Sequence, residues 1–316
     1  MYKRQKINLI REYTYLENNF KSSFDTENIA LYGQYKYPFS ETIDIEVGLR
    51  VESRDADYVD NNGPAPDGFF CIAIYPKPES CLFNNEYSNS EDFWGGKIVI
   101  KNQISDNLFS YFLISQGYKP GGINIEGNVT NENLEYDSET MINYELGIKG
   151  NLNKNLLFQT SIFYQDREDV QTKQSIVKSI NSGEQGGLCP CSFTDYIGNA
   201  VKGSNYGLEM ELIWLINNEL DLFFNLGLLE TEFNNYLSFS HVDSDLENGI
   251  PVNLNGREQS HAPRYQLSLG MNYKITDSLF IKFDIEAKDE FYFSDRHNVQ
   301  SDDYVLFNLL LGYQKE

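Results

Sequence analysis

Four cysteines stand in two local pairs and could form covalent cross-links. Cys71 and Cys81 share one polar segment, and Cys189 and Cys191 flank Pro190. Local pairs of this kind fit disulfides that staple loops in an oxidising compartment. Of the two, Cys71–Cys81 is favoured, because Cys189–Cys191 would close a very tight ring. A zinc site is the alternative, although neither spacing matches the usual Cys-x₂₋₄-Cys pattern.

Other residues that could act in catalysis are scattered. The three histidines, His241, His261 and His297, all fall in or beside predicted loops. Ser260 precedes His261, but adjacent residues of a strand point to opposite faces. The sequence contains no Gly-x-Ser-x-Gly elbow, P-loop, His-Glu-x-x-His or Gly-x-Gly-x-x-Gly motif. We therefore expect no catalytic residue and no enzyme activity.

An acidic segment at 241–248 (HVDSDLEN) is the strongest candidate for a cation site. Asp243, Asp245 and Glu247 could supply oxygen ligands to Ca²⁺. The segment fits an EF-hand loop poorly, because Gly249 comes one position late and Leu254 stands where the bidentate Glu belongs. We therefore interpret it as a solvated loop and expect neither a metal site nor a cofactor.

Charge and hydropathy exclude several classes of protein. The 316 residues carry 25 Lys and Arg against 47 Asp and Glu, a formal net charge of −22. Nucleic-acid binding requires clustered cations, so no nucleic-acid partner is expected. No run of about 18 apolar residues could form a transmembrane helix. Residues 1–11 lack the apolar run of a signal peptide, so we expect a cytosolic chain or a piece of a longer exported protein.

Alternation with a period of two residues dominates the chain. Within 42–52 the odd positions are Ile43, Ile45, Val47, Leu49 and Val51, whereas the even positions are polar or Gly. This pattern is typical of a strand with one apolar and one wet face. It recurs at 142–148, 206–214, 265–273 and 279–285.

Connections of two lengths join these strands. Short polar turns at 38–41, 105–107, 153–155, 217–219 and 276–278 alternate with long polar segments near 55–93, 119–138, 181–195, 235–262 and 294–302. This layout is typical of an outer-membrane barrel. A soluble antiparallel sheet would explain the alternation but not the two classes of connection.

We therefore predict an all-β fold, a transmembrane antiparallel β-barrel, here a partial barrel of about twelve strands. The expected strands are 8–20, 27–38, 42–54, 94–104, 107–118, 139–151, 155–178, 196–216, 219–234, 263–275, 278–293 and 303–314.

Several motifs resemble one family. They are YFLISQGYKPGGIN at 111–124, SETMINYELGIKG at 138–150, SIFYQDREDVQ at 161–171, GNAVKGSNYGLEME at 198–211 and YVLFNLLLGY at 304–313. This succession resembles the carboxy-terminal barrel region of TonB-dependent outer-membrane receptors of the iron-complex (siderophore) type. The resemblance covers about residues 28–313.

The resemblance carries expectations of function and partners. It implies location in the outer membrane, contact with lipid, and uptake of an iron complex or similar nutrient. Full-length members also have an amino-terminal plug, a TonB box that engages the TonB complex, and 22 strands. None of these is visible here, so we expect residues 1–316 to be one barrel domain, a fragment without plug or final strands. The alternatives are a plugless outer-membrane pore, a surface-binding barrel or a non-functional gene fragment.

Two groups of residues on the predicted strands carry further expectations. Gly147, Gly207 and Gly270 fall on wet-face positions, where missing side chains would leave room for a plug or ease sheet curvature. Glu139 and Glu145 could pair with nearby lysines, but we expect them to be solvated.

Overall fold

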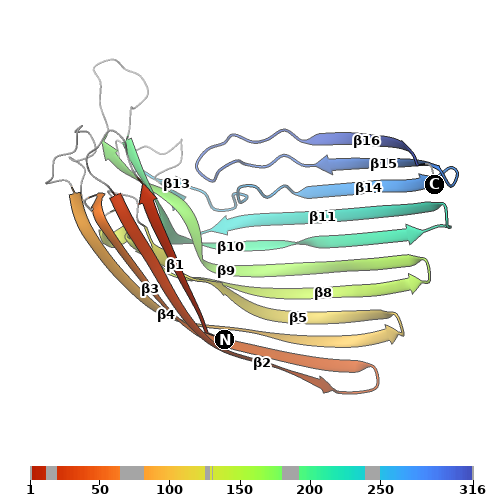
Figure 1. Ribbon diagram of the computed structural model, residues 1–316, viewed down its shortest axis with the longest axis horizontal. Coiled ribbons are helices and arrows are strands. Elements are labelled where there is room, and N and C mark those ends of the chain that lie inside the picture. Colours follow the sequence, from red (N-terminus) through yellow and green to blue (C-terminus); the bar gives the residue numbers. More distant parts are fainter. Residues whose placement is uncertain are drawn as a thin grey trace, which may run out of the picture.

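The computed structural model describes residues 2–11, 20–64, 82–124, 129, 131–179, 192–238 and 250–314. In these ranges, twelve strands form one antiparallel sheet in which neighbours along the chain are neighbours in space (Figure 1). They are β1 (Tyr2–Arg11), β2 (Phe20–Pro38), β3 (Ile43–Pro64), β4 (Leu82–Ser105), β5 (Leu108–Lys119), β8 (Glu139–Asn153), β9 (Leu156–Ser179), β10 (Ser192–Leu215), β11 (Leu220–Asn234), β14 (Tyr265–Lys274), β15 (Leu279–Lys288) and β16 (Tyr304–Tyr313). The outer segments contain β6 (Gly122–Ile123), the 3₁₀ helix η3 (Asn131–Asn133), β7 (Glu135–Tyr136), β12 (Leu237–Ser238) and β13 (Val252–Asn253).

The five short turns lie together at one end of the sheet, and the long connections lie at the other (Figure 1). The predicted topology is thereby confirmed. Side-chain oxygens that accept backbone N–H groups shape four of the turns, one of them at 153–155, where Asn153 Oδ1 accepts from Asn155 N at 2.9 Å. Asn217 Oδ1 accepts from Leu220 N at 2.8 Å, Thr276 Oγ1 accepts from Leu279 N at 3.0 Å, and Ser40 Oγ accepts from Ile43 N at 3.0 Å.

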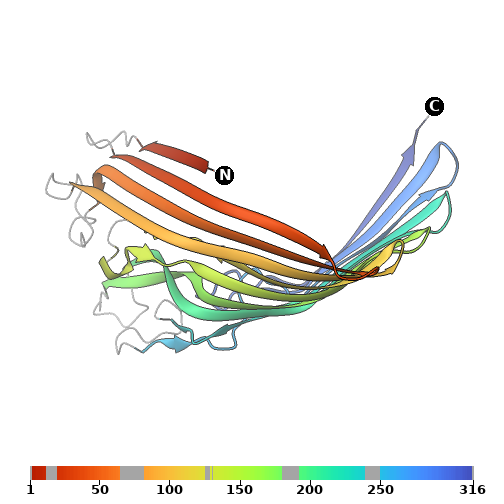
Figure 2. The same ribbon diagram turned by 90° about the horizontal axis from the view of Figure 1, so that it is seen from below.

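The two faces of the sheet separate apolar from polar side chains, as the alternation predicts. On β3, Val47 and Leu49 are 46% and 54% exposed on the convex face. On the other face, Glu46 pairs with Lys97 at 2.5 Å across β3 and β4. The sheet curves around this polar face (Figure 2). Exposed apolar residues continue across the convex face on other strands, among them Ile98, Leu146, Ile162, Leu269, Phe307 and Leu309.

The sheet is open. In the described ranges β1 pairs only with β2 and β16 only with β15, so each leaves one edge without a partner strand. The sheet is thus a curved wall, as expected for a partial barrel. Among the described residues, Val170, Phe233, Tyr236 and Leu254 form a small cluster of buried apolar side chains near the long connections. No helix in the described part of the chain is long and apolar enough to cross a membrane.

Some predicted boundaries are wrong. The strand expected at 8–20 is β1 at Tyr2–Arg11, and Phe20 already belongs to β2. Much of the loop expected at 55–93 is strand, because β3 continues to Pro64 and β4 begins at Leu82. Strand β15 ends at Lys288, before the expected residue 293. Pairing with a neighbouring strand therefore continues well into polar sequence.

Candidate functional site

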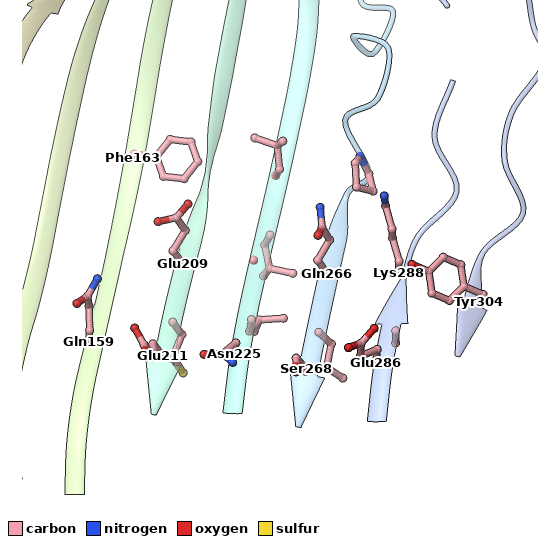
Figure 3. A pocket seen from close by; sticks show the side chains of 18 residues that line it. Gln159, Phe163, Glu209, Glu211, Asn225, Gln266, Ser268, Glu286, Lys288 and Tyr304 are labelled. Carbon is pink, nitrogen blue, oxygen red and sulfur yellow. The ribbon is translucent and has the colours of Figure 1, made fainter. Parts of the chain in front are cut away.

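The concave face forms a polar wall with a pocket of about 520 Å³ across β9 to β16 (Figure 3). Strand register places Glu211, Asn225, Ser268 and Glu286 in one row, each opposite the next. A second row contains Glu209, Gly227, Gln266 and Lys288. Carboxylates and amides from four strands therefore line one continuous surface.

The pocket is acidic. Glu209, Glu211 and Glu286 are all exposed, and none forms an ion pair with another described residue. Lys288, the pocket's cation, directs its ammonium to the Phe291 ring, 4.4 Å from the centroid. Such a surface can accept hydrogen bonds and attract cations. It thus offers a binding wall of hydrogen-bond acceptors.

Aromatic rings cover four glycines of the concave face. Each of these glycines faces a ring directly opposite it on the neighbouring strand: Tyr111 faces Gly147, Phe163 faces Gly207, Phe223 faces Gly270 and Phe280 faces Gly312. A Cβ added to Gly147 would lie 2.5 Å from the Tyr111 ring. The rings therefore fill the space directly above these four glycines, and the expectation that the missing side chains leave room for a plug or ease sheet curvature stays a prediction. Rings over strand glycines help to fix register.

Both motif glutamates have partners, which corrects the expectation that they are solvated. Glu139 accepts two hydrogen bonds from Arg167 and one from the Gln171 backbone N–H at 3.0 Å. Its side chain is only 8% exposed. Glu145 accepts from the Tyr111 hydroxyl at 2.5 Å. The partner of Glu139 is an arginine on the next strand, not a nearby lysine.

An outer cap, defined here as residues 250–264 and 289–303, packs against β9 to β11. Leu254 joins Val170 and Phe233 in the small apolar cluster. Arg296 donates to Asp195 Oδ1 at 2.7 Å and to Ser175 Oγ at 2.5 Å. The cap is therefore attached to β9 and β10 at points distant in sequence.

Charge at this attachment keeps Asp195 ionised. Burial by itself would raise the pKa of the Asp195 carboxyl. Hydrogen bonds from Lys173, Ser175 and Arg296 outweigh that effect and lower the pKa to about 2. The attachment therefore stays charged through the ordinary pH range.

Most residues considered first for chemistry lie outside the described ranges. These are all four cysteines, including the Cys71–Cys81 pair, and the acidic segment at 241–248. His261 lies 5.6 Å from the Phe291 ring, and His297 accepts a hydrogen bond from Arg257 through its backbone oxygen. The described residues contain no group of three or more His, Cys, Asp or Glu placed to hold a metal ion.

The polar wall and the cap were not predicted as one surface. Period two did predict that Glu209, Glu211 and Glu286 face away from lipid. No pattern in the sequence indicated the strand register that aligns these glutamates with polar residues of neighbouring strands. The Arg296–Asp195 contact joins residues about a hundred positions apart, and again no local pattern indicates it.

Comparison with known proteins gives curated relatives and similar structures. A pesticin receptor of Yersinia enterocolitica is 23% identical over 291 residues, covering 91% of this chain and 37% of the relative. The ferric yersiniabactin uptake receptor FyuA of Yersinia pestis superposes with a TM-score of 0.70 at 20% identity, covering 99% of this chain and 42% of FyuA. The siderophore receptor PiuA of Acinetobacter baumannii superposes with a TM-score of 0.68 at 15% identity, covering 94% of this chain and 38% of PiuA.

The chain thus spans well under half the length of these proteins, and the structural likeness shows a shared fold. Residues 2–316 match the family described as TonB dependent receptor-like, beta-barrel. Because that match covers nearly the whole chain, the protein belongs to the TonB-dependent receptor-like β-barrel family, a family of receptors and transporters rather than enzymes.

Proposed function

We propose that this chain forms part of the wall of an outer-membrane receptor that takes up an iron complex, such as a siderophore, or a similar nutrient. The observation that carries the proposal is the division of one curved sheet into an apolar convex face and a polar concave face. In an outer-membrane barrel the first face meets lipid and the second meets a water-filled interior. The convex exposure of Leu49, Leu146 and Phe307 would be unfavourable in water.

The nature of the cargo is supported by the relatives. One similar structure is of a ferric yersiniabactin uptake receptor and another is of a siderophore receptor. We infer that the concave wall and the cap border the path of a comparable ligand. Energy from the TonB complex would enter through the plug and TonB box that full-length members carry.

The function is binding and passage, not catalysis. The pocket lining contains three carboxylates, three amides, one serine, one lysine and one tyrosine beside apolar residues such as Phe163 and Met210, and neither His261 nor His297 lies in it. A wall of this composition holds a ligand by hydrogen bonds and charge.

Uptake by cells tests the proposal. The gene that encodes this chain would be deleted in its host, and uptake of radioactive iron would be measured with a panel of ferric siderophores. We expect uptake of at least one complex to fall and to return when the gene is restored. Dependence on TonB would be measured in a strain without TonB. Unchanged uptake across the panel would contradict the proposal, and TonB-independent solute leakage would instead favour a plugless pore.

A further inference from the structure

The sheet divides into two parts beyond the middle of its strands. Pairing of β4 with β5 ends at Gly96 and Gln116, whereas β3 and β4 stay paired up to Pro64 and Leu82. Pairing of β8 with β9 likewise ends at Thr140 and Glu168, whereas β9 and β10 continue to Ser179 and Ser192. We call these extensions the first blade (β3 and β4) and the second blade (β9 and β10). Between them the shorter strands β5 and β8 end, so the two blades are not joined by strand pairing (Figures 1 and 2).

A strap, defined as residues 120–124 and 131–137, lies between the two blades (Figure 2). It contains β6, η3 and β7, and β6 pairs with β7. Close packing requires its glycines. A Cβ on Gly121 would lie 2.3 Å from the Tyr136 carbonyl oxygen, and one on Gly122 would lie 2.5 Å from the Tyr136 hydroxyl. The Pro-Gly-Gly motif thus serves the compactness of the strap.

The strap binds the second blade through six hydrogen bonds among the described residues. Asn124, 8% exposed, donates to Ile197 O and accepts from Ile197 N, both at 2.8 Å. Asn199 makes the same paired contact with the backbone of Asp137, twice at 2.7 Å. Gln171 donates to Pro120 O at 2.9 Å and to Asp137 O at 3.0 Å. Paired contacts of this kind fix orientation as well as position.

The first blade holds the strap much less firmly. Arg54 donates to Gly121 O at 3.0 Å, and its second partner is Glu91 of its own blade at 3.5 Å. Glu91 accepts a hydrogen bond from the Gly121 backbone N–H, but it also faces two acidic residues of the strap, Glu135 and Asp137, whose charges act against its own. Arg54 is thus the cation that holds together surfaces that would otherwise repel.

From this asymmetry we propose that the strap is a hinged cover, which stays attached to the second blade and detaches from the first at Arg54. Detachment opens a passage between β4 and β9 and gives lateral access from outside to the concave wall. The assignment of that wall as a ligand path rests on the proposed function. The motion itself does not, so it can be tested without ligand or uptake.

Distances between spin labels test the hinge in the full chain in lipid nanodiscs. The four cysteines are replaced by serine, and labels are placed at three exposed positions: Glu132 on the strap, Ser90 on the first blade and Asp166 at the base of the second. In Arg54→Ala we expect the 132–90 distances to shift to longer values while the 132–166 distances stay unchanged. Arg54→Lys, which keeps the positive charge on a long side chain, should give a smaller shift and guards against misfolding of the alanine variant.

Two further variants complete the test. Lys97→Ala removes a cation and its ion pair with Glu46 from the same two strands, below the first blade, and should leave both distances unchanged. Asn124→Ala should instead broaden the 132–166 distances, because it removes contacts on the hinge side. The proposal is overturned if Arg54→Ala changes neither distance, or if it changes both equally.

Discussion

At the scale of single residues, the paired rings and glycines predict how sensitive each position is to an added methyl group. A Cβ on Gly270 would lie 2.4 Å from Phe223 Cζ, whereas one on Gly227 would meet nothing within 4 Å. We expect Gly270→Ala to lower the free energy of unfolding by about 1–3 kcal/mol because the Phe223 ring must move. Gly227→Ala, on the same face, is the control. Urea unfolding of the refolded chain measures both, and equal shifts would contradict the predicted role of the ring.

The Glu139–Arg167 pair yields a second prediction. Arg167→Ala would leave a carboxylate that is 8% exposed with only the Gln171 N–H, so we expect a loss on the order of 2 kcal/mol. Adding Glu139→Gln should recover part of the lost free energy of unfolding, because the side chain left without Arg167 is then neutral. Arg264→Ala removes a 57%-exposed arginine paired with Glu258 and should cost less than about 1 kcal/mol. Equal losses for the two arginine variants in urea titrations would refute this.

At the scale of elements, the sequence predicts strands where the two faces of the sheet meet different surroundings. Ile43 to Val51 alternate with polar residues because one face is apolar and the other wet. In the first blade the regular pattern breaks down: Asp57 lies opposite Ser88 on one face, and on the other face a buried Asp60 follows the buried Ala56 and Tyr58. The alternation disappears there although the strand continues, which is why 55–64 and 82–93 were expected to be loop.

The strap was also expected to be loop, for a different reason. Its structure depends on Asn124 meeting Ile197 and on Arg54 meeting Gly121, contacts between segments more than sixty residues apart. Turn-forming residues predict where a strand ends, but they do not indicate what the following segment binds. The same limit applies to the cap and its contact with Asp195.

The strap should respond to pH through Glu91. Burial is the main cause that raises the pKa of the Glu91 carboxyl; Arg54 and a hydrogen bond from the Gly121 backbone N–H lower it, and Asp137 and Glu135 raise it further. Tyr136 also lies near this charge. If detachment hydrates Glu91, its pKa returns toward the ordinary value near 4.5. Glu91 then binds its proton more tightly when the strap is closed than when it is detached. Protonation therefore favours closure below the ordinary pKa, and this stabilisation of the closed position is lost as the pH rises through the raised pKa.

The 132–90 label pair measures this response. We expect the short distances to be more populated at pH 4.5 than at pH 8. Glu91→Gln, which imitates the neutral carboxyl, should keep them populated at both pH values. Glu86→Gln, on the opposite face of β4, should leave the response intact. A shift toward long distances on acidification would show that the sign is wrong.

At the scale of the whole molecule, the division between faces determines where charge is tolerated. The net charge of −22 is carried by the concave wall, the blades and the connections. The convex face is apolar in the part of the sheet between the blades and the short turns. On β4 the two environments are one residue apart. Ile98 is 49% exposed on the convex face and lies opposite Val47, whereas Val99 lies opposite Glu46 on the concave face.

These neighbours allow a matched test of membrane insertion. Ile98 lies between the exposed Trp94 and Ile104, near the middle of the apolar band. We expect Ile98→Arg to cost about 2–4 kcal/mol in lipid vesicles, because the guanidinium would face hydrocarbon. Val99→Arg places the same side chain in the wet interior beside Glu46 and should cost less than about 1 kcal/mol. The fraction inserted and the urea titration in vesicles measure both variants. Equal losses would mean that the convex face does not contact lipid, and would remove the main support for an outer-membrane receptor.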